Sequence, residues 1–249
     1  MAAELQEIDL ADFERKVHSQ NGEDGVLEKI FELVGTTNKF FVEFGVEDGS
    51  ECNTKYLREA HGWSGLMMDG SHSNPSINLQ QEFITAENIN ELFLRYNVPK
   101  SFDLLSIDID FNDFYVWKQI SGYRPRVVVI EYNATHLPGE DRVVRYDATA
   151  KWDGSNYFGA SFLSLRRLGL SKEYSLVYAE SHGVNLFFIA DAVLQSVAES
   201  QRTTFKGVSN PDSLYRPPNY PKPFGGGPNN GHPADPKGRQ YSSADALLC

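Results

Sequence analysis

Residues 39–49 read Lys-Phe-Phe-Val-Glu-Phe-Gly-Val-Glu-Asp-Gly. An apolar run ends here at the acid Glu43, and Gly45 and Gly49 follow closely. Such a run is typical of a strand buried on both faces of a sheet. Glycines placed directly after it allow a tight turn and a close approach of the backbone to a ligand. Because the next segment has a helical pattern, the turn is expected at a helix N-terminus.

A second apolar run covers residues 63–68 and ends at Asp69. In a doubly wound sheet, an acid at the end of the second strand is well placed to bind the hydroxyl groups of a ribose. The two runs together predict a site for a small molecule that contains an adenosine.

The remaining sequence alternates between strand and helix patterns. Further strands are expected over 82–85, 103–109, 126–131, 174–180 and 184–190, and helices over 8–18, 23–34, 51–60, 74–81, 87–96, 111–120 and 157–168. Alternation of this kind predicts a parallel sheet with helices on both faces. Only three residues separate the last two strands, too few for a parallel crossover, so these two must pair antiparallel. We therefore predict an α/β, Rossmann-like, doubly wound and mostly parallel seven-stranded sheet that ends in an antiparallel hairpin.

Composition excludes several classes of function. The net charge is −11 and the pI about 5.0, which disfavours binding to nucleic acid through its phosphates. No apolar run is long enough for a membrane helix, and the N-terminus lacks the pattern of a signal peptide. Two cysteines cannot supply a disulfide framework or a zinc cluster. We expect a cytoplasmic protein that binds neither membranes nor nucleic acid.

The C-terminal segment, residues 201–249, differs from the body. It holds eight of the twelve prolines and a run of three glycines at 225–227. We therefore expect one folded domain over 1–200 and an extended or disordered tail over 201–249. One interpretation is an unattached tail. The other is a segment that packs across the body, or binds a protein partner, through Tyr215, Tyr220, Phe224 and Tyr241.

Acidic and polar side chains follow the fourth and fifth expected strands, over 103–109 and 126–131. Asp108 and Asp110 alternate with isoleucines and so point to one side, and two like charges that close require a cation, a donor or a shared proton. Asn112 and Asp113 are either part of this cluster or caps of the following helix. Asn133 and His136 follow Glu131 at the end of the next strand.

Other candidates have an ordinary structural interpretation beside the functional one. Glu87 and Asn88 are placed to meet an adenine edge. Glu43 faces a ligand or caps the next helix, Asp69 binds ribose or starts a turn, and His136 is catalytic or solvated. The aromatic stretch 152–161 walls a pocket or seals the core.

Several of these motifs resemble the FkbM-type methyltransferases. They are residues 19–24, the strand and turn at 41–50 with Asn53 and Thr54, residues 62–65, and the strands at 102–110 and 129–133. The resemblance implies a class I methyltransferase fold that binds S-adenosylmethionine and methylates an oxygen of a sugar or another small molecule. The antiparallel hairpin agrees with this fold.

The resemblance also implies roles for single residues. The turn with Glu43, Gly45 and Gly49 would hold the methionine end, helped by Gln20, and Asp108 would lie on the cofactor side. Asp110 would be the general base or a metal ligand, with His136 as the second choice of base.

The turn is also similar to that of metal-dependent sugar O-methyltransferases related to macrocin methyltransferase. This similarity would make Asp108, Asp110 and Asn133 ligands of Mg²⁺.

Two other functions stay open. A non-catalytic protein of the same fold would act through the C-terminal segment by recruiting a partner. An NAD-dependent oxidoreductase fits the position of Asp69, but its Gly-x-Gly-x-x-Gly pattern is absent.

Overall fold

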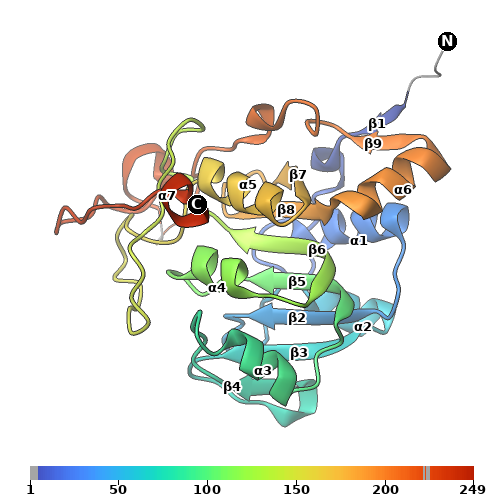
Figure 1. Cartoon of the computed structure of the whole chain (residues 1–249), viewed down its shortest axis with the longest axis horizontal. Helices are drawn as coiled ribbons and strands as arrows, with labels where there is room; N and C mark the ends of the chain where they lie inside the picture. Colours follow the sequence, from blue (N-terminus) through green and yellow to red (C-terminus); the bar gives the residue numbers. More distant parts are fainter. Residues whose placement is uncertain (1–4, 221, 223–224) are drawn as a thin grey trace.

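A seven-stranded sheet runs through the centre of the molecule (Figure 1). The structure is a computed structural model that describes residues 5–220, 222 and 225–249. The strands are β2 (Phe40–Phe44), β3 (Ser64–Asp69), β4 (Leu79–Gln81), β5 (Ser101–Ile107), β6 (Arg124–Glu131), β7 (Tyr174–Ala179) and β8 (Asn185–Ala190). Their order is β4-β3-β2-β5-β6-β8-β7, and β8 alone runs against its neighbours. This is the strand order of the class I methyltransferase fold, so the predicted fold class is confirmed.

Helices cover both faces of the sheet, as Figure 1 shows. One face carries α1 (Glu23–Val34), α2 (Lys55–His61) and α6 (Asp191–Gln201), and the other carries α3 (Ile89–Arg95), α4 (Asp113–Gln119) and α5 (Phe162–Ser171). Successive strand residues serve opposite faces: Val127 packs in the first layer and Val128 in the second. Within the described part of the chain, no helix has the length and apolarity needed to span a membrane.

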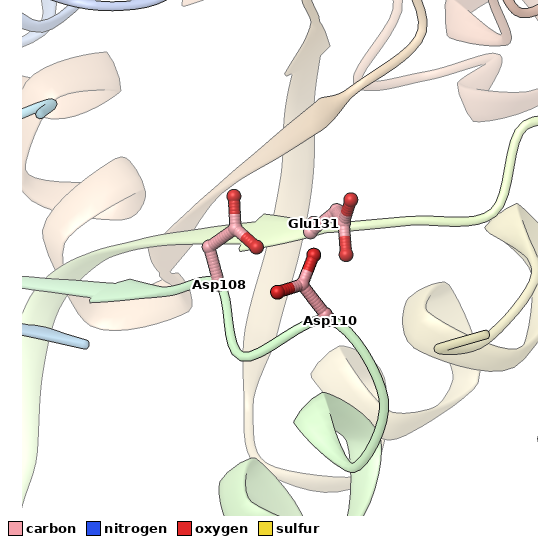
Figure 2. Close-up of side chains that lie close together, drawn as sticks. All are labelled: Asp108, Asp110 and Glu131. Carbon is pink, nitrogen blue, oxygen red and sulfur yellow. The ribbon is translucent and has the colours of Figure 1, made fainter. Parts of the chain in front are cut away.

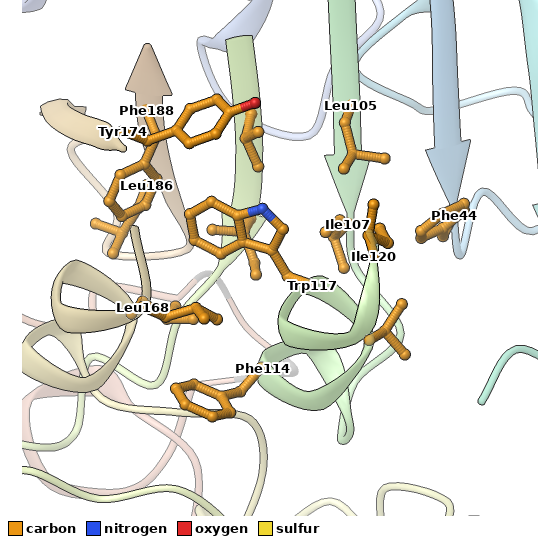
Figure 3. Packing of buried hydrophobic residues seen from close by; sticks show 14 of the residues in the cluster. Phe44, Leu105, Ile107, Phe114, Trp117, Ile120, Leu168, Tyr174, Leu186 and Phe188 are labelled. Atoms are coloured by element: carbon orange, nitrogen blue, oxygen red, sulfur yellow. The ribbon is translucent and has the colours of Figure 1, made fainter. Parts of the chain in front are cut away.

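Trp117 on α4 fixes the antiparallel hairpin to the parallel part of the sheet (Figure 3). The indole is 1% exposed, and its ring centroid lies 5.0 Å from that of Phe188 and 6.0 Å from that of Tyr174. Gly169 on α5 leaves room for this cluster, because a Cβ there would lie 2.7 Å from the Phe188 ring. One large aromatic side chain thus joins α4, β7 and β8.

Two predicted helices are wrong. The segment 8–18 holds the end of strand β1 (Gln6–Ile8) and one 3₁₀ turn (Leu10–Phe13). Further along, the Asp24 carboxylate accepts the backbone N–H groups of residues 17–19 at 2.7–2.8 Å, a role that a helix would have given to carbonyls.

The segment 74–81 holds a 3₁₀ turn (Pro75–Ile77) and then β4, which replaces the strand expected at 82–85. Asn74 caps the turn through Ser76 N–H, and Asn78, with φ +54°, ends it.

The described residues of the C-terminal segment lie against the body. Strand β9 (Thr203–Phe205) pairs in parallel with β1, and a short helix, α7 (Ala244–Leu248), lies near the C-terminus. Hydroxyl groups of Tyr215, Tyr220 and Tyr241 donate to backbone carbonyls of the body at 2.8, 3.3 and 2.9 Å. Phe224 lies outside the described residues.

Replacing Gly45 by alanine is expected to destabilise the protein far more than replacing Gly35. Both glycines have φ +67°, which side chains disfavour, so both substitutions carry backbone strain of about 1–3 kcal/mol. A Cβ at Gly45 would lie 1.6 Å from the Asp108 carbonyl oxygen, whereas one at Gly35 would meet no atom within 4 Å.

Urea unfolding of Gly45→Ala and Gly35→Ala measures the difference in the free energy of unfolding, which we expect to exceed ~2 kcal/mol. Equal losses in the two variants would contradict the close contact.

Candidate functional site

Three carboxylates meet at the carboxyl ends of β5 and β6: Asp108, Asp110 and Glu131, here called the acid group. Figure 2 shows their side chains pointing toward one another. Each offers an oxygen, and these oxygens lie within 4.8 Å of one another. Asp108 and Glu131 are partly buried, and Asp110 is exposed. The two strands are parallel neighbours, so their carboxyl ends meet at one edge of the sheet.

The acid group is a concentration of negative charge. Burial raises the pKa of Asp108 and of Glu131 well above the ordinary values, and nearby acids, Asp110 and Asp113 among them, raise both further. The pKa of Asp110 is also raised, first because the surrounding protein atoms remove water from its carboxyl group although the residue reaches the surface, and then by Glu47 and Asp69. Among the described residues, Oε2 of Glu131 is buried without a hydrogen-bond partner. Such a set of oxygens suits a positively charged ligand.

The loop after β5 holds Asp110 in a left-handed backbone conformation. Its φ is +63°, which is uncommon for a residue other than glycine. Inside the loop, Ile109 N–H donates to Oδ1 of the fully buried Asp113 at 2.8 Å. Asn112 stands at the N-cap position of α4, but its amide donates to the Asp147 carbonyl at 2.9 Å. Both residues therefore brace the loop rather than cap the helix with their side chains.

Glu43 caps the start of α2 in this structure. Its carboxylate accepts the N–H groups of Asn53 at 2.7 Å and of Thr54 at 3.1 Å, and also the Thr54 hydroxyl. Burial raises the Glu43 pKa, and these hydrogen bonds oppose the rise. The geometry matches the structural interpretation, in which Glu43 caps a helix.

The glycines of the 43–49 turn are required by contacts within the protein. Gly45 passes directly over the Asp108 carbonyl, and Gly49, with φ +79°, faces the Ile77 side chain. The close approach inferred from the sequence is real at Gly45, but the neighbour is the end of β5.

Asp69 ties the end of β3 to the same turn. Its Oδ2 accepts Glu47 N–H at 2.9 Å, and Oδ1 accepts the N–H groups of Ser71 and His72 at 2.8 and 3.1 Å. Burial acts to raise the Asp69 pKa, but the hydrogen bonds from Ser71, His72 and Glu47 outweigh it and the pKa is lowered. Asp69 is therefore ionised at neutral pH.

The sequence did not single out Phe83, whose ring lies next to Gly70, the residue after Asp69. This side chain is 45% exposed, and a Cβ at Gly70 would lie 3.4 Å from its ring. An apolar residue directly after a short edge strand was the available signal.

The remaining cofactor candidates are Asn88, Glu87 and Gln20. Asn88 accepts Thr85 N–H at 2.8 Å and donates to the Phe83 carbonyl at 2.9 Å, so its amide is used within the loop. Glu87 accepts the Tyr146 hydroxyl, and Gln20 is exposed.

Asn133 and His136 are buried in the loop after β6. The Asn133 amide donates to the carbonyls of Asn156 and Phe158 at 2.8 and 3.0 Å, and its oxygen accepts a backbone N–H. Burial lowers the His136 pKa to about 4, and its ring packs against Tyr241 with centroids 4.8 Å apart. Glu131, which precedes this loop, joins Asp108 and Asp110 in the structure.

Comparison with known proteins adds little beyond the fold. No family model and no curated protein matches the chain. Among solved structures, the chain is similar to an O-methyltransferase family protein from Burkholderia thailandensis, with 9% identity over 68% of this chain and 57% of that one and a TM-score of 0.37. The chain thus spans little more than half the length of this neighbour, and the assignment of fold rests on the strand order.

Neutral, buried His136 is expected to make stability depend on pH. In the unfolded chain it gains a proton below pH ~6.5, but in the folded protein only below about 4. The unfolded state therefore binds more protons between these values, and stability falls as the pH drops through this window.

His136→Phe keeps a ring against Tyr241 and removes the titration. Urea unfolding at pH 7 and at pH 4.5 should show that the variant loses about 2–3 kcal/mol less than the wild type. Parallel losses would show that His136 titrates normally.

Proposed function

We propose that the chain is an S-adenosylmethionine-dependent methyltransferase that acts on a hydroxyl group of a sugar or another small molecule. The supporting observation is the acid group, where every charged neighbour that shifts the pKa of a member is itself an acid. S-adenosylmethionine carries a sulfonium and an ammonium group, so its net charge complements such a site. The FkbM-type resemblance of the strands and turns that form this edge agrees with the proposal.

The residues at the carboxyl ends of the strands fit this cofactor. Oδ2 of Asp69 accepts one hydrogen bond, from Glu47, and keeps a lone pair for a ribose hydroxyl. Asp108 and the turn with Gly45 and Gly49 would hold the amino acid end, with Gln20 beside it, and Glu87 and Asn88 would meet the adenine. When bound, the cofactor supplies a methyl group made electrophilic by positive sulfur.

In this mechanism the chain positions the acceptor hydroxyl and takes up its proton. Asp110 is the first choice of base, because it is the exposed member of the acid group and its raised pKa makes it a stronger base than an ordinary carboxylate. Alignment of acceptor and methyl group supplies much of the remaining rate enhancement. His136 is second, because its lowered pKa makes it a weak base.

A divalent cation such as Mg²⁺ fits the acid group. Its three carboxylates offer oxygens within 4.8 Å of one another, and oxygen ligands of this kind suit a hard cation. Oε2 of Glu131 is buried and has no hydrogen-bond partner among the described residues. We add Glu131 to this set as a third ligand. Asn133 stays a further candidate, because its amide nitrogen donates to two carbonyls but its oxygen accepts only one backbone N–H. The bound cation would lower the pKa of the acceptor hydroxyl, and Asp110 would then be its ligand rather than the base.

Wild-type protein is expected to bind S-adenosylmethionine in calorimetry. Asp69→Asn should weaken binding at least tenfold, because it removes the charged acceptor for the ribose, whereas Asp110→Asn should change it less than threefold. Thermal unfolding of both variants serves as the control for folding. Absence of heat at millimolar ligand with folded wild-type protein would rule out the proposal.

Chelator-treated protein is expected to bind Mg²⁺ in a calorimetric titration. Asp108→Asn and Glu131→Gln should each weaken binding at least tenfold, and Glu91→Gln on α3, an exposed acid paired with Arg95, should not. If the wild type does not bind millimolar Mg²⁺, the cation is excluded and Asp110 acts as the base.

A further inference from the structure

The loop that carries Asp110 is held from outside by an aromatic side chain of the 152–161 stretch. Phe111, the residue after Asp110, is 5% exposed, and its ring centroid lies 5.9 Å from that of Tyr157. Asp110 has φ +63°, a conformation that costs free energy in a residue other than glycine, although aspartate adopts it more readily than most. Contacts on the loop help to maintain it.

Tyr157 is in turn held by the C-terminal segment. Its hydroxyl donates to the Gln240 carbonyl at 3.0 Å and accepts Arg145 N–H at 3.0 Å. Its ring lies 4.8 Å from that of Tyr241 and 4.2 Å below the Arg239 guanidinium. Tyr157 is only 3% exposed, so it links the Asp110 loop on one side with residues 239–241 on the other.

Arg239 fixes this arrangement by a network of charged hydrogen bonds. Its guanidinium donates to the carboxylates of Asp153 at 2.8 Å and Asp235 at 3.0 Å, and to the Ser155 hydroxyl at 3.0 Å. A planar group that stacks on a ring and binds two carboxylates at once cannot be replaced by lysine. The 152–161 stretch and residues 235–241 are thereby joined at one point.

We infer that Tyr157 and Arg239 are positioning residues for Asp110, so that the C-terminal segment is a working part of the candidate active site. The inference rests on the proposed function for the role of Asp110, but the mechanical link can be measured without it. An unattached tail or one reserved for a partner would not contact the loop of a catalytic base. Here a series of contacts leads from Arg239 to Tyr157 and from Tyr157 to Phe111, the residue next to Asp110.

The chain offers a matched control for Arg239. Arg166 on α5 pairs with Asp212 of the C-terminal segment at 2.6 Å, and the side chains of both arginines are 26% exposed. Both arginines therefore bind the segment to the body, but only Arg239 stacks on Tyr157. Comparison of Arg239→Gln with Arg166→Gln separates a general loosening of the segment from an effect on Asp110.

Hydrogen–deuterium exchange and carboxyl NMR test the inference. In Arg239→Gln, peptides that cover 108–113 should exchange at least fivefold faster, and the carboxyl ¹³C resonance of Asp110 should move away from its wild-type position. Arg166→Gln should leave both unchanged. Tyr157→Phe, which keeps the ring on Phe111 and loses both hydroxyl hydrogen bonds, should give an intermediate result and serves if Arg239→Gln does not fold.

The inference is overturned if neither variant changes the 108–113 peptides, or if Arg166→Gln changes them as much as Arg239→Gln. A wild type that does not bind the cofactor would end the proposed function, while the exchange result would still decide the link.

Discussion

The contact between Gly45 and the Asp108 carbonyl brings together the two central strands of the sheet at their carboxyl ends. From this point β3 and β4 extend the sheet in one direction, and β6, β8 and β7 extend it in the other. A doubly wound sheet opens its ligand crevice where the strand order reverses. The carboxyl ends of these parallel strands lie along one edge of the sheet, here called the rim. Asp69, Asp108, Asp110 and Glu131 stand on that rim because they follow these strands.

The rim is electrostatically unfavourable in the protein by itself. Raised pKa values at Asp108, Asp110 and Glu131 mean that the fold opposes the ionisation of all three. In contrast, Asp69 and Glu43 receive backbone N–H groups and serve the architecture of the turn. The acids of the candidate site therefore divide into two kinds. One kind is satisfied by the protein, and the other is satisfied only by something that binds.

The sequence predicts the fold class, because the strands are strongly apolar and the three-residue link makes the last two strands pair antiparallel. It was also sufficient to bring Asp108 and Asp110 to one side of a strand end. It did not indicate that Glu131 is the third member or that the Asn133 amide donates to the carbonyls of Asn156 and Phe158, because these contacts join segments that are distant in sequence. The predicted helix over 8–18 is absent, and at the end of that segment the Asp24 carboxylate, from outside it, accepts the backbone N–H groups of residues 17–19. Propensity describes a segment alone, and such partners are invisible to it.

The pairing of β1 with β9 has a consequence for the order in which the molecule is made. These strands lie almost 200 residues apart, and β1 has no other strand to pair with in the described structure. On the ribosome, residues 6–8 must therefore wait until residues 203–205 have been synthesised. The segment from Leu10 to Asp24 does not depend on this pairing, because Leu10 is buried against the same core as α1 and Asp24 binds residues 17–19. The strand pairing of residues 6–8 is therefore the last part of the N-terminal region to form, after all seven strands of the main sheet exist.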